Sequence, residues 1–311
     1  MAQRSRASQA LVKKLRAFRG AVLKRVPLKK VQCWAERTAI FQRTKPVTLH
    51  AMNVAGDPRL PFLRKAVTQG SLREVDVRDG KNHFKLHAWF LPPKDSMPVV
   101  IFSYGNAANL ADAKYLMESF GRRGIGFLAW SYPGYEYSEG WPSEQNVSDG
   151  LEAMSHYLAR QHGIRPSDQI AMGHSLGGLV TVDVATRVPF KLAVLIATAP
   201  SLPDYYEHLL EELPPLLRSL CLPKERIDQR FDAFAKIRSI QTPVMFIYFD
   251  EDAEVLPSMA KKLISRSSTP NYELLLHATD HDAILDPDTA EEIGHAVSAK
   301  ASELVMPFAV R

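Results

Sequence analysis

A serine stands at the centre of the pentapeptide GHSLG, residues 173–177. The apolar run 169–172 precedes the pentapeptide, and a helix-like stretch, 176–187, begins inside it. This order predicts a strand, a tight turn and a helix, with Ser175 in a turn whose flanking glycines leave room for neighbouring backbone. A serine hydroxyl is a poor nucleophile at neutral pH and requires a base and an oxyanion site. The spacing therefore predicts that Ser175 is a nucleophile.

The elements that must position this serine alternate between strand and helix patterns from about residue 71 onward. Alternating polarity around Asp79-Gly80 predicts an initial hairpin. Short, unbroken apolar runs then predict strands buried on both faces of a mostly parallel central sheet, with helices on either side. The hairpin strands are 72–77 and 83–91, the later strands begin near 99, 126, 169, 192, 244 and 272, and the helices span 108–122, 144–162, 176–187, 256–266 and 288–305.

The composition excludes several classes of protein. No apolar run approaches the roughly 20 residues needed to span a bilayer. Two cysteines, Cys33 and Cys221, are too few for a disulfide framework and favour a reducing, cytoplasmic compartment. No His or Cys cluster has zinc-ligand spacing, and no glycine-rich phosphate loop is present. We therefore expect no metal and no cofactor.

Positive charge is concentrated at the N-terminus. Ten of the 39 Lys and Arg residues lie in residues 1–35, so the rest of the chain has 29 basic against 34 acidic residues, a net charge of -5. Apolar residues at helical spacing follow one face of this arm: Leu11, Leu15, Phe18 and Val22. The pattern fits a helix packed on the domain, peripheral membrane contact, or an organellar import signal.

We expect no nucleic-acid partner for this arm, because no base-reading motif accompanies the charge. Comparing vesicle binding with and without residues 1–35 separates the membrane alternative from the others.

Three segments carry a resemblance to a known family: GHSLGG at 173–178, SYGNAANL at 103–110 and SYPGYEYSEG at 131–140. Together they resemble the α/β-hydrolase superfamily, and within it the Bem46-like and serine aminopeptidase-type (S33-like) serine hydrolases, which include eukaryotic depalmitoylases. The resemblance covers roughly residues 70–300. It implies an α/β-hydrolase fold for residues 36–311, with a small helical lid at about 201–240.

The resemblance also implies an oxyanion hole and a triad. The oxyanion donors would be the amides of Asn106 and Leu176. Chain order in this fold is nucleophile, acid, base, which places the acid after strand 243–249 and the base after strand 272–277. Asp252 fits the acid position, with Asp250 as the alternative. His281 fits the base position better than His277, and carboxylates flanking it would raise its pKa. His174 is expected to pack behind the nucleophile turn.

The substrate is less closely defined. Tyr104, which replaces a histidine usual in the family, and Tyr205 and Tyr206 in the lid are candidate substrate contacts. Leucines in the lid would either line an acyl pocket or form the lid's own core: Leu202, Leu209, Leu210, Leu213, Leu216 and Leu217. The preferred prediction is a serine hydrolase that cleaves esters or thioesters of a small-molecule or acylated substrate. The alternatives are a peptidase-type amide hydrolase and a non-catalytic binding or scaffold protein.

Overall fold

The computed structural model describes residues 40–49, 52, 56–211, 218 and 223–304. The predicted arm, the leucines at 213, 216 and 217, and both cysteines lie outside these residues, so the interpretations that rest on them stay predictions. Within the described residues, no helix is long and apolar enough to cross a membrane.

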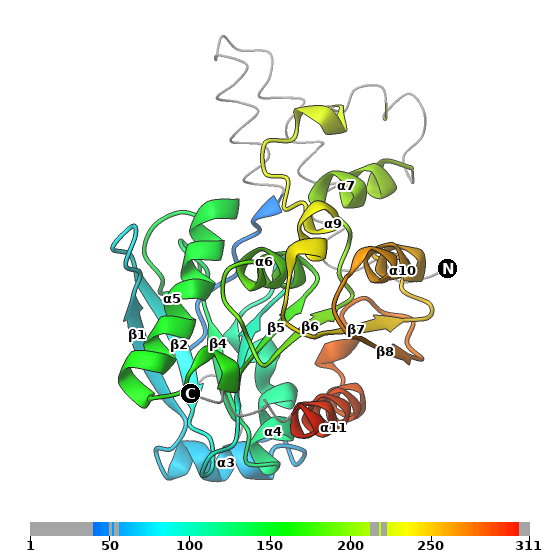
Figure 1. The fold of residues 1–311 in the computed structure, drawn as a ribbon. Helices are drawn as coiled ribbons and strands as arrows, with labels where there is room; N and C mark the ends of the chain where they lie inside the picture. Colours follow the sequence, from blue (N-terminus) through cyan, green and yellow to red (C-terminus); the bar gives the residue numbers. More distant parts are fainter. Residues whose placement is uncertain (1–39, 50–51, 53–55, 212–217, 219–222, 305–311) are drawn as a thin grey trace, which may run out of the picture.

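A single sheet of eight strands forms the centre of the molecule, in the order β1-β2-β4-β3-β5-β6-β7-β8 (Figure 1). From β2 to β4 the pairing is antiparallel, and from β4 to β8 it is parallel. The predicted hairpin is confirmed, with Arg78 opposite Lys85. The strands are β1 Arg73–Arg78, β2 Lys85–Leu91, β3 Val99–Ser103, β4 Gly126–Trp130, β5 Gln169–His174, β6 Leu192–Ile196, β7 Val244–Phe249 and β8 Asn271–Leu276. The α/β-hydrolase fold predicted for the chain is confirmed.

The strand order locates a natural site. The crossover from β3 to β4 runs in one direction along the sheet, and the crossover from β5 to β6 runs in the other. Right-handed crossovers in opposite directions place their helices on opposite faces, and ligands bind where the direction reverses, beyond the carboxyl ends of the strands. That reversal lies at the β3/β5 pair, where Ser103 is opposite Gly173.

Helices cover both faces of the sheet (Figure 1). Helices α4 and α11 pack against each other with α3 beside α4, while α5 packs against α6. The predicted helix 108–122 is divided, because Asn109 and Asp112 form a capping box that begins a short 3₁₀ turn, η2, before α4. The main helices are α3 Pro61–Thr68, η2 Leu110–Ala113, α4 Lys114–Arg122, α5 Glu144–His162, α6 Leu176–Ala185, α10 Pro257–Arg266 and α11 Pro287–Glu303.

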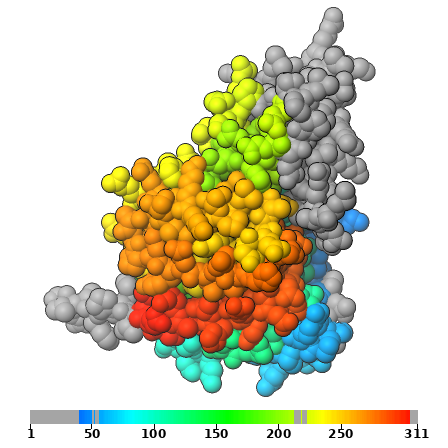
Figure 2. Space-filling view, turned by 90° about the vertical axis from the view of Figure 1, so that its right-hand side faces the viewer, coloured from blue at the N-terminus to red at the C-terminus, as the bar shows by residue number. Residues whose placement is uncertain are grey.

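The segment predicted as a lid lies between β6 and β7. Its described parts are α7 Leu202–Glu211, η4 Lys224–Arg226, α9 Ala233–Lys236 and η5 Ile237–Ser239. Helix α9 packs on α6, and the segment stands above the body of the molecule in Figure 2, in green and yellow. That it covers a substrate site stays a prediction.

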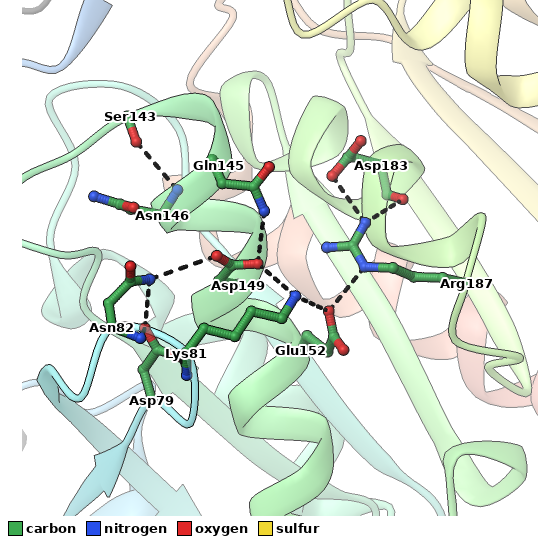
Figure 3. Close-up of polar contacts among 10 residues, drawn as sticks. All are labelled: Asp79, Lys81, Asn82, Ser143, Gln145, Asn146, Asp149, Glu152, Asp183 and Arg187. Carbon is green, nitrogen blue, oxygen red and sulfur yellow. Dashed lines mark hydrogen bonds and ion pairs between the residues drawn. The ribbon is translucent and has the colours of Figure 1, made fainter.

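A series of ion pairs links the β1–β2 hairpin to helices α5 and α6 (Figure 3). Lys81, in the turn between β1 and β2, contacts Asp149 at 2.7 Å and Glu152 at 3.1 Å, both on α5. Glu152 also accepts from Arg187, which pairs with Asp183 of α6. These contacts connect the hairpin to α5 and to the C-terminal end of α6, the helix that begins directly after Ser175.

Candidate active site

Ser175 occupies the turn between β5 and α6, which confirms the predicted strand–turn–helix context. Its φ of 52° and ψ of -115° are strained for a residue other than glycine. The Ser175 amide donates to the Ile196 carbonyl at 2.8 Å, which ties the turn to β6. The side chain is half-buried. Such a turn presents a serine hydroxyl at the end of the sheet.

The glycines beside Ser175 are required by close backbone packing. A Cβ at Gly173 would lie 2.1 Å from the Gly177 carbonyl oxygen, and a Cβ at Gly177 would lie 1.9 Å from the Ser103 carbonyl oxygen. Both are far inside van der Waals contact with backbone that cannot swing away. The end of β3 therefore runs directly beside the start of α6.

This proximity brings the loop after β3 to Ser175. A Cβ at Gly105 would lie 2.8 Å from His174 Nδ1 and 3.4 Å from the Ser175 Cβ. Asn106 follows at once, and its Oδ1 accepts from the Ala107 amide at 3.0 Å. Leu176, the other predicted donor, begins α6, whose first amides lack partners within the helix. The loop that carries Asn106 therefore lies close to Ser175, and Leu176 directly follows Ser175 in the chain. The role of these two amides as oxyanion donors stays a prediction.

Asp252 and His281 form a buried pair. His281 Nδ1 lies 2.7 Å from Asp252 Oδ2, and the two residues are 6% and 2% exposed. The other carboxylate oxygen, Oδ1, accepts from the amides of Glu254 at 2.8 Å and Val255 at 2.9 Å. Burial raises the pKa of Asp252, but the hydrogen bond from His281 and these amides bring it below its usual value. Asp252 is therefore held as a charged acceptor.

Asp250 and His277 form a second pair, 2.7 Å apart, on the surface. The His277 side chain is 79% exposed. Its hydrogen bond with Asp250 raises the pKa of His277 above the usual value. Of the two acid–histidine combinations that the sequence offers, only the one containing Asp252 and His281 is buried.

His174 connects the turn that carries Ser175 to the loop that carries His281. It is 2% exposed, its Nε2 lies 3.0 Å from the His281 carbonyl oxygen, and the two rings lie 4.9 Å apart. Burial lowers the pKa of His174 to about 3, so the ring is neutral and its Nε2–H donates to that carbonyl. The sequence predicted packing for His174; the structure adds a direct bond to the backbone of His281.

The charges around His281 favour its protonated form. Burial lowers the pKa of His281, but the hydrogen bond to Asp252 and the charges of Asp252, Glu254 and Asp282 together raise it to about 9. The predicted effect of a flanking carboxylate is thus confirmed for Asp282. The larger contribution comes from Asp252.

Glu254 is a residue of the site that sequence reasoning missed. It is 8% exposed, its Oε2 accepts from the Tyr205 hydroxyl at 3.1 Å, and its buried Oε1 has no hydrogen-bond partner among the described residues. Burial raises the pKa of Glu254. The neighbouring Ala253 carbonyl contacts His208 Nε2 at 2.9 Å. Helix α7 of the lid is therefore bound directly to the loop that carries Asp252. In the sequence, the only sign of this link is the acidic run at 250–254.

The three tyrosines predicted to contact substrate lie in different surroundings. Tyr104 is 1% exposed, packs against Tyr132 at 4.5 Å and lies 3.4 Å from Glu136 through its hydroxyl. This burial disfavours a substrate contact for its side chain and favours a role in fixing the loop after β3. Tyr205 and Tyr206 are half-buried on α7, and Tyr205 is the one that contacts Glu254. Within the described residues, no group of three acidic, histidine or cysteine side chains could hold a metal ion.

Comparison with known proteins places this arrangement in a family. The family model described as serine aminopeptidase, S33, matches residues 95–306, which include all the residues of the site. The chain belongs to the serine aminopeptidase (S33) family of α/β hydrolases. Membership makes it a hydrolase, and the S33-like resemblance of its sequence motifs is confirmed.

Curated relatives and solved structures are also similar to this chain. The chain is 32% identical over 189 residues to the alpha/beta hydrolase domain-containing protein 17C of Xenopus tropicalis, a match covering 60% of this chain and only 56% of the relative. An α/β hydrolase from Vibrio vulnificus has a TM-score of 0.62 at 19% identity, over 85% of this chain and 96% of its own. An esterase from Pyrococcus furiosus has a TM-score of 0.61 at 18% identity, over 75% and 92%. At such identities these two neighbours show a shared fold alone.

Proposed function

We propose that this S33-family hydrolase cleaves carboxylic esters or thioesters through an acyl-enzyme on Ser175. The observation that carries the proposal is the buried Asp252–His281 pair, bound through His174 to the turn that holds Ser175. A histidine that is oriented by a buried carboxylate, in a loop bonded to the strained turn of a serine, can activate the serine hydroxyl once its free nitrogen reaches that hydroxyl. In the part of the chain that the structure describes, the exposed Asp250–His277 pair makes no hydrogen bond to this turn.

The reaction would proceed in two steps, acylation of Ser175 and hydrolysis of the acyl-enzyme. Ser175 Oγ attacks the substrate carbonyl carbon while His281 Nε2 takes the hydroxyl proton, and the carbonyl oxygen becomes an oxyanion facing the amides of Asn106 and Leu176. The bond to the alcohol or thiol then breaks, and His281 returns the proton to that leaving group. Water repeats the sequence on the acyl-enzyme and releases the acid. Asp252 stabilises the imidazolium throughout without taking its proton.

The preferred substrate carries an apolar acyl chain. The described leucines of the lid support this class: Leu202 is buried and Leu209 and Leu210 are half-buried on α7, whose Tyr205 contacts the acid loop. The resemblance to depalmitoylases points the same way. An amide substrate with a free N-terminus is the competing class, and the name of the matched family is the observation that favours it.

A panel of substrates tests the proposal. The full chain would be assayed with matched p-nitrophenyl esters, acyl thioesters and aminoacyl p-nitroanilides, the esters and thioesters at several acyl lengths. We expect kcat/KM for esters and thioesters to rise with acyl length, because each buried methylene contributes about 0.8 kcal/mol. Faster cleavage of the anilides would instead support the peptidase alternative. A folded chain that cleaves none of them would support the binding or scaffold alternative.

The pH dependence of this reaction should reflect the charges around His281. Only the neutral imidazole can accept the Ser175 proton, so kcat/KM should rise as pH increases through the pKa of His281. Because that pKa is raised to about 9, we expect the acidic limb to lie well above pH 6.5. Asp282→Asn removes one of the charges that raise the pKa and should move the limb to lower pH. A limb at or below pH 6.5 in the wild-type chain would contradict this assignment.

A further inference from the structure

A segment ahead of the sheet crosses the loop that carries Asn106. We call residues 41–47 the strap and residues 104–110 the oxyanion loop. The Gln42 amide donates to Asn106 Oδ1 at 2.9 Å, and the Thr44 hydroxyl donates to the Ala108 carbonyl at 3.0 Å. Each contact joins residues 64 positions apart in the chain. The predicted elements began only near residue 71, so nothing in the sequence assigned the strap a place.

The two strap contacts lie on either side of a strained residue. Ala107 has a φ of 60°, a conformation that non-glycine residues avoid. Its own amide donates to Asn106 Oδ1, the atom that also accepts from the Gln42 amide. Strained backbone persists only where its surroundings over-determine it, and it is concentrated at functional sites. The strap supplies part of that restraint, immediately next to the amide proposed to bind the oxyanion.

Glu136 clamps the strap and the oxyanion loop together. Its carboxylate accepts from the Leu110 amide at 3.4 Å and contacts the Tyr104 hydroxyl at 3.4 Å, so it reaches both ends of the loop. It also accepts from the Val47 amide at the end of the strap. Glu136 itself has a φ of 42°. A second residue at positive φ is thus held against the same loop.

The other end of the strap is anchored in the lid segment. Phe41 is 3% exposed and packs edge-on against Phe231, with ring centroids 6.2 Å apart. Phe231 lies between η4 and α9 and is 1% exposed. The strap therefore has a buried apolar anchor at Phe41 and three polar contacts, at Gln42, Thr44 and Val47, that face the oxyanion loop and Glu136.

We propose that the strap is a positioning element for the oxyanion hole, through which Gln42 and Thr44 hold the Asn106 amide in place for the developing oxyanion. This inference rests on the proposed acyl-transfer function. Oxyanion donors must be aimed before the reaction begins, and a misplacement of about 1 Å in a catalytic site can lower the rate 100-fold. Loosening the strap should therefore weaken transition-state binding more than substrate binding.

Two matched pairs of variants in the full chain test the strap. Thr44→Val removes the donor to the Ala108 carbonyl while keeping the shape of the side chain, and Thr44→Ser restores a hydroxyl. Gln42→Pro removes the amide hydrogen that reaches Asn106, and Gln42→Ala keeps it. We expect kcat to fall by about tenfold in Thr44→Val, with KM within about twofold, and to stay near the wild-type value in Thr44→Ser. We also expect kcat to be lower in Gln42→Pro than in Gln42→Ala, because both lose the buried side chain and only proline also loses the amide hydrogen.

The affinity for a transition-state analogue distinguishes a strap that positions the oxyanion hole from one that only stabilises the fold. The affinity for a trifluoromethyl ketone with the preferred acyl chain should fall in parallel with kcat in Thr44→Val and recover in Thr44→Ser. Equal kcat and equal analogue affinity in all four variants and the wild type would overturn the proposal. So would equal losses in Thr44→Val and Thr44→Ser.

Amide hydrogen exchange separates this proposal from the proposed function. Peptides covering residues 104–110 should exchange faster in Thr44→Val than in Thr44→Ser, whether or not the chain turns over substrate. A wild-type chain that neither cleaves esters nor is labelled at Ser175 would contradict the proposed function, and with it the strap's part in an oxyanion hole. Exchange would then decide only whether the strap restrains the loop, and equal rates in the two variants would refute that as well.

Discussion

Replacing Ser175 with alanine is expected to lower kcat for the preferred ester by at least about four orders of magnitude. The reason is chemical rather than structural. The substitution removes the only atom that attacks the carbonyl, while alanine fits the turn and the Ser175 amide can still donate to the Ile196 carbonyl. The thermal midpoint should therefore stay close to that of the wild-type chain. Labelling by a fluorophosphonate probe should disappear, because the probe forms its bond to the same oxygen.

A second serine provides the control for this experiment. Ser201 is buried and its hydroxyl contacts Asp204 at the start of α7, so Ser201→Ala removes a different serine hydroxyl and leaves Ser175 unchanged. We expect Ser201→Ala to retain labelling. Labelling and turnover that persist in Ser175→Ala would place the nucleophile elsewhere. A folded wild-type chain with neither labelling nor turnover would favour the binding or scaffold alternative.

Local patterns in the sequence predicted most of the sheet. The strands that precede and follow Ser175 are short apolar runs, and α5 extends from Glu144 to His162 as its pattern indicated. These elements can be predicted because the hydrophobic pattern of each segment indicates its own secondary structure and burial. The order of the strands is different: which neighbour β4 or β5 pairs with depends on crossovers whose direction no local pattern records.

The parts of the site that could not be predicted depend on distant contacts. The sequence favoured Asp252 over Asp250 through the family resemblance alone, because the two stand two residues apart in one acidic run and only distant contacts decide which carboxylate faces inward. The bond from His174 to the His281 carbonyl joins residues 107 positions apart. The strap has neither helical nor strand periodicity, and its role became visible only from the atoms it contacts. Substitution of the family's histidine by Tyr104 indicated a changed loop, but not that the ring is buried beside Glu136.

Asp252→Asn is expected to lower kcat by about 10⁴-fold, as the loss of a correctly oriented triad acid does. Asn Oδ1 can still accept from the amides of Glu254 and Val255, so the acid loop should keep its shape. The amide nitrogen, however, takes the place of the oxygen that faces His281 Nδ1. That nitrogen can only donate, so Nδ1 must accept and the imidazole proton moves to Nε2. The base then presents a hydrogen to Ser175 and cannot remove one.

The exposed pair supplies a matched control for this second prediction. Asp250→Asn makes the same chemical change beside His277, whose side chain is 79% exposed, where water screens the interaction and a surface pair contributes about 0–1 kcal/mol. We expect its kcat to stay within about twofold of the wild-type value. The two variants should also differ in pH dependence: loss of the Asp252 charge lowers the pKa of His281, so the acidic limb of any residual activity moves to lower pH, and in Asp250→Asn it stays in place. A larger loss in Asp250→Asn than in Asp252→Asn would reverse the assignment, and it would mean that the working site assembles around the surface pair rather than the buried one.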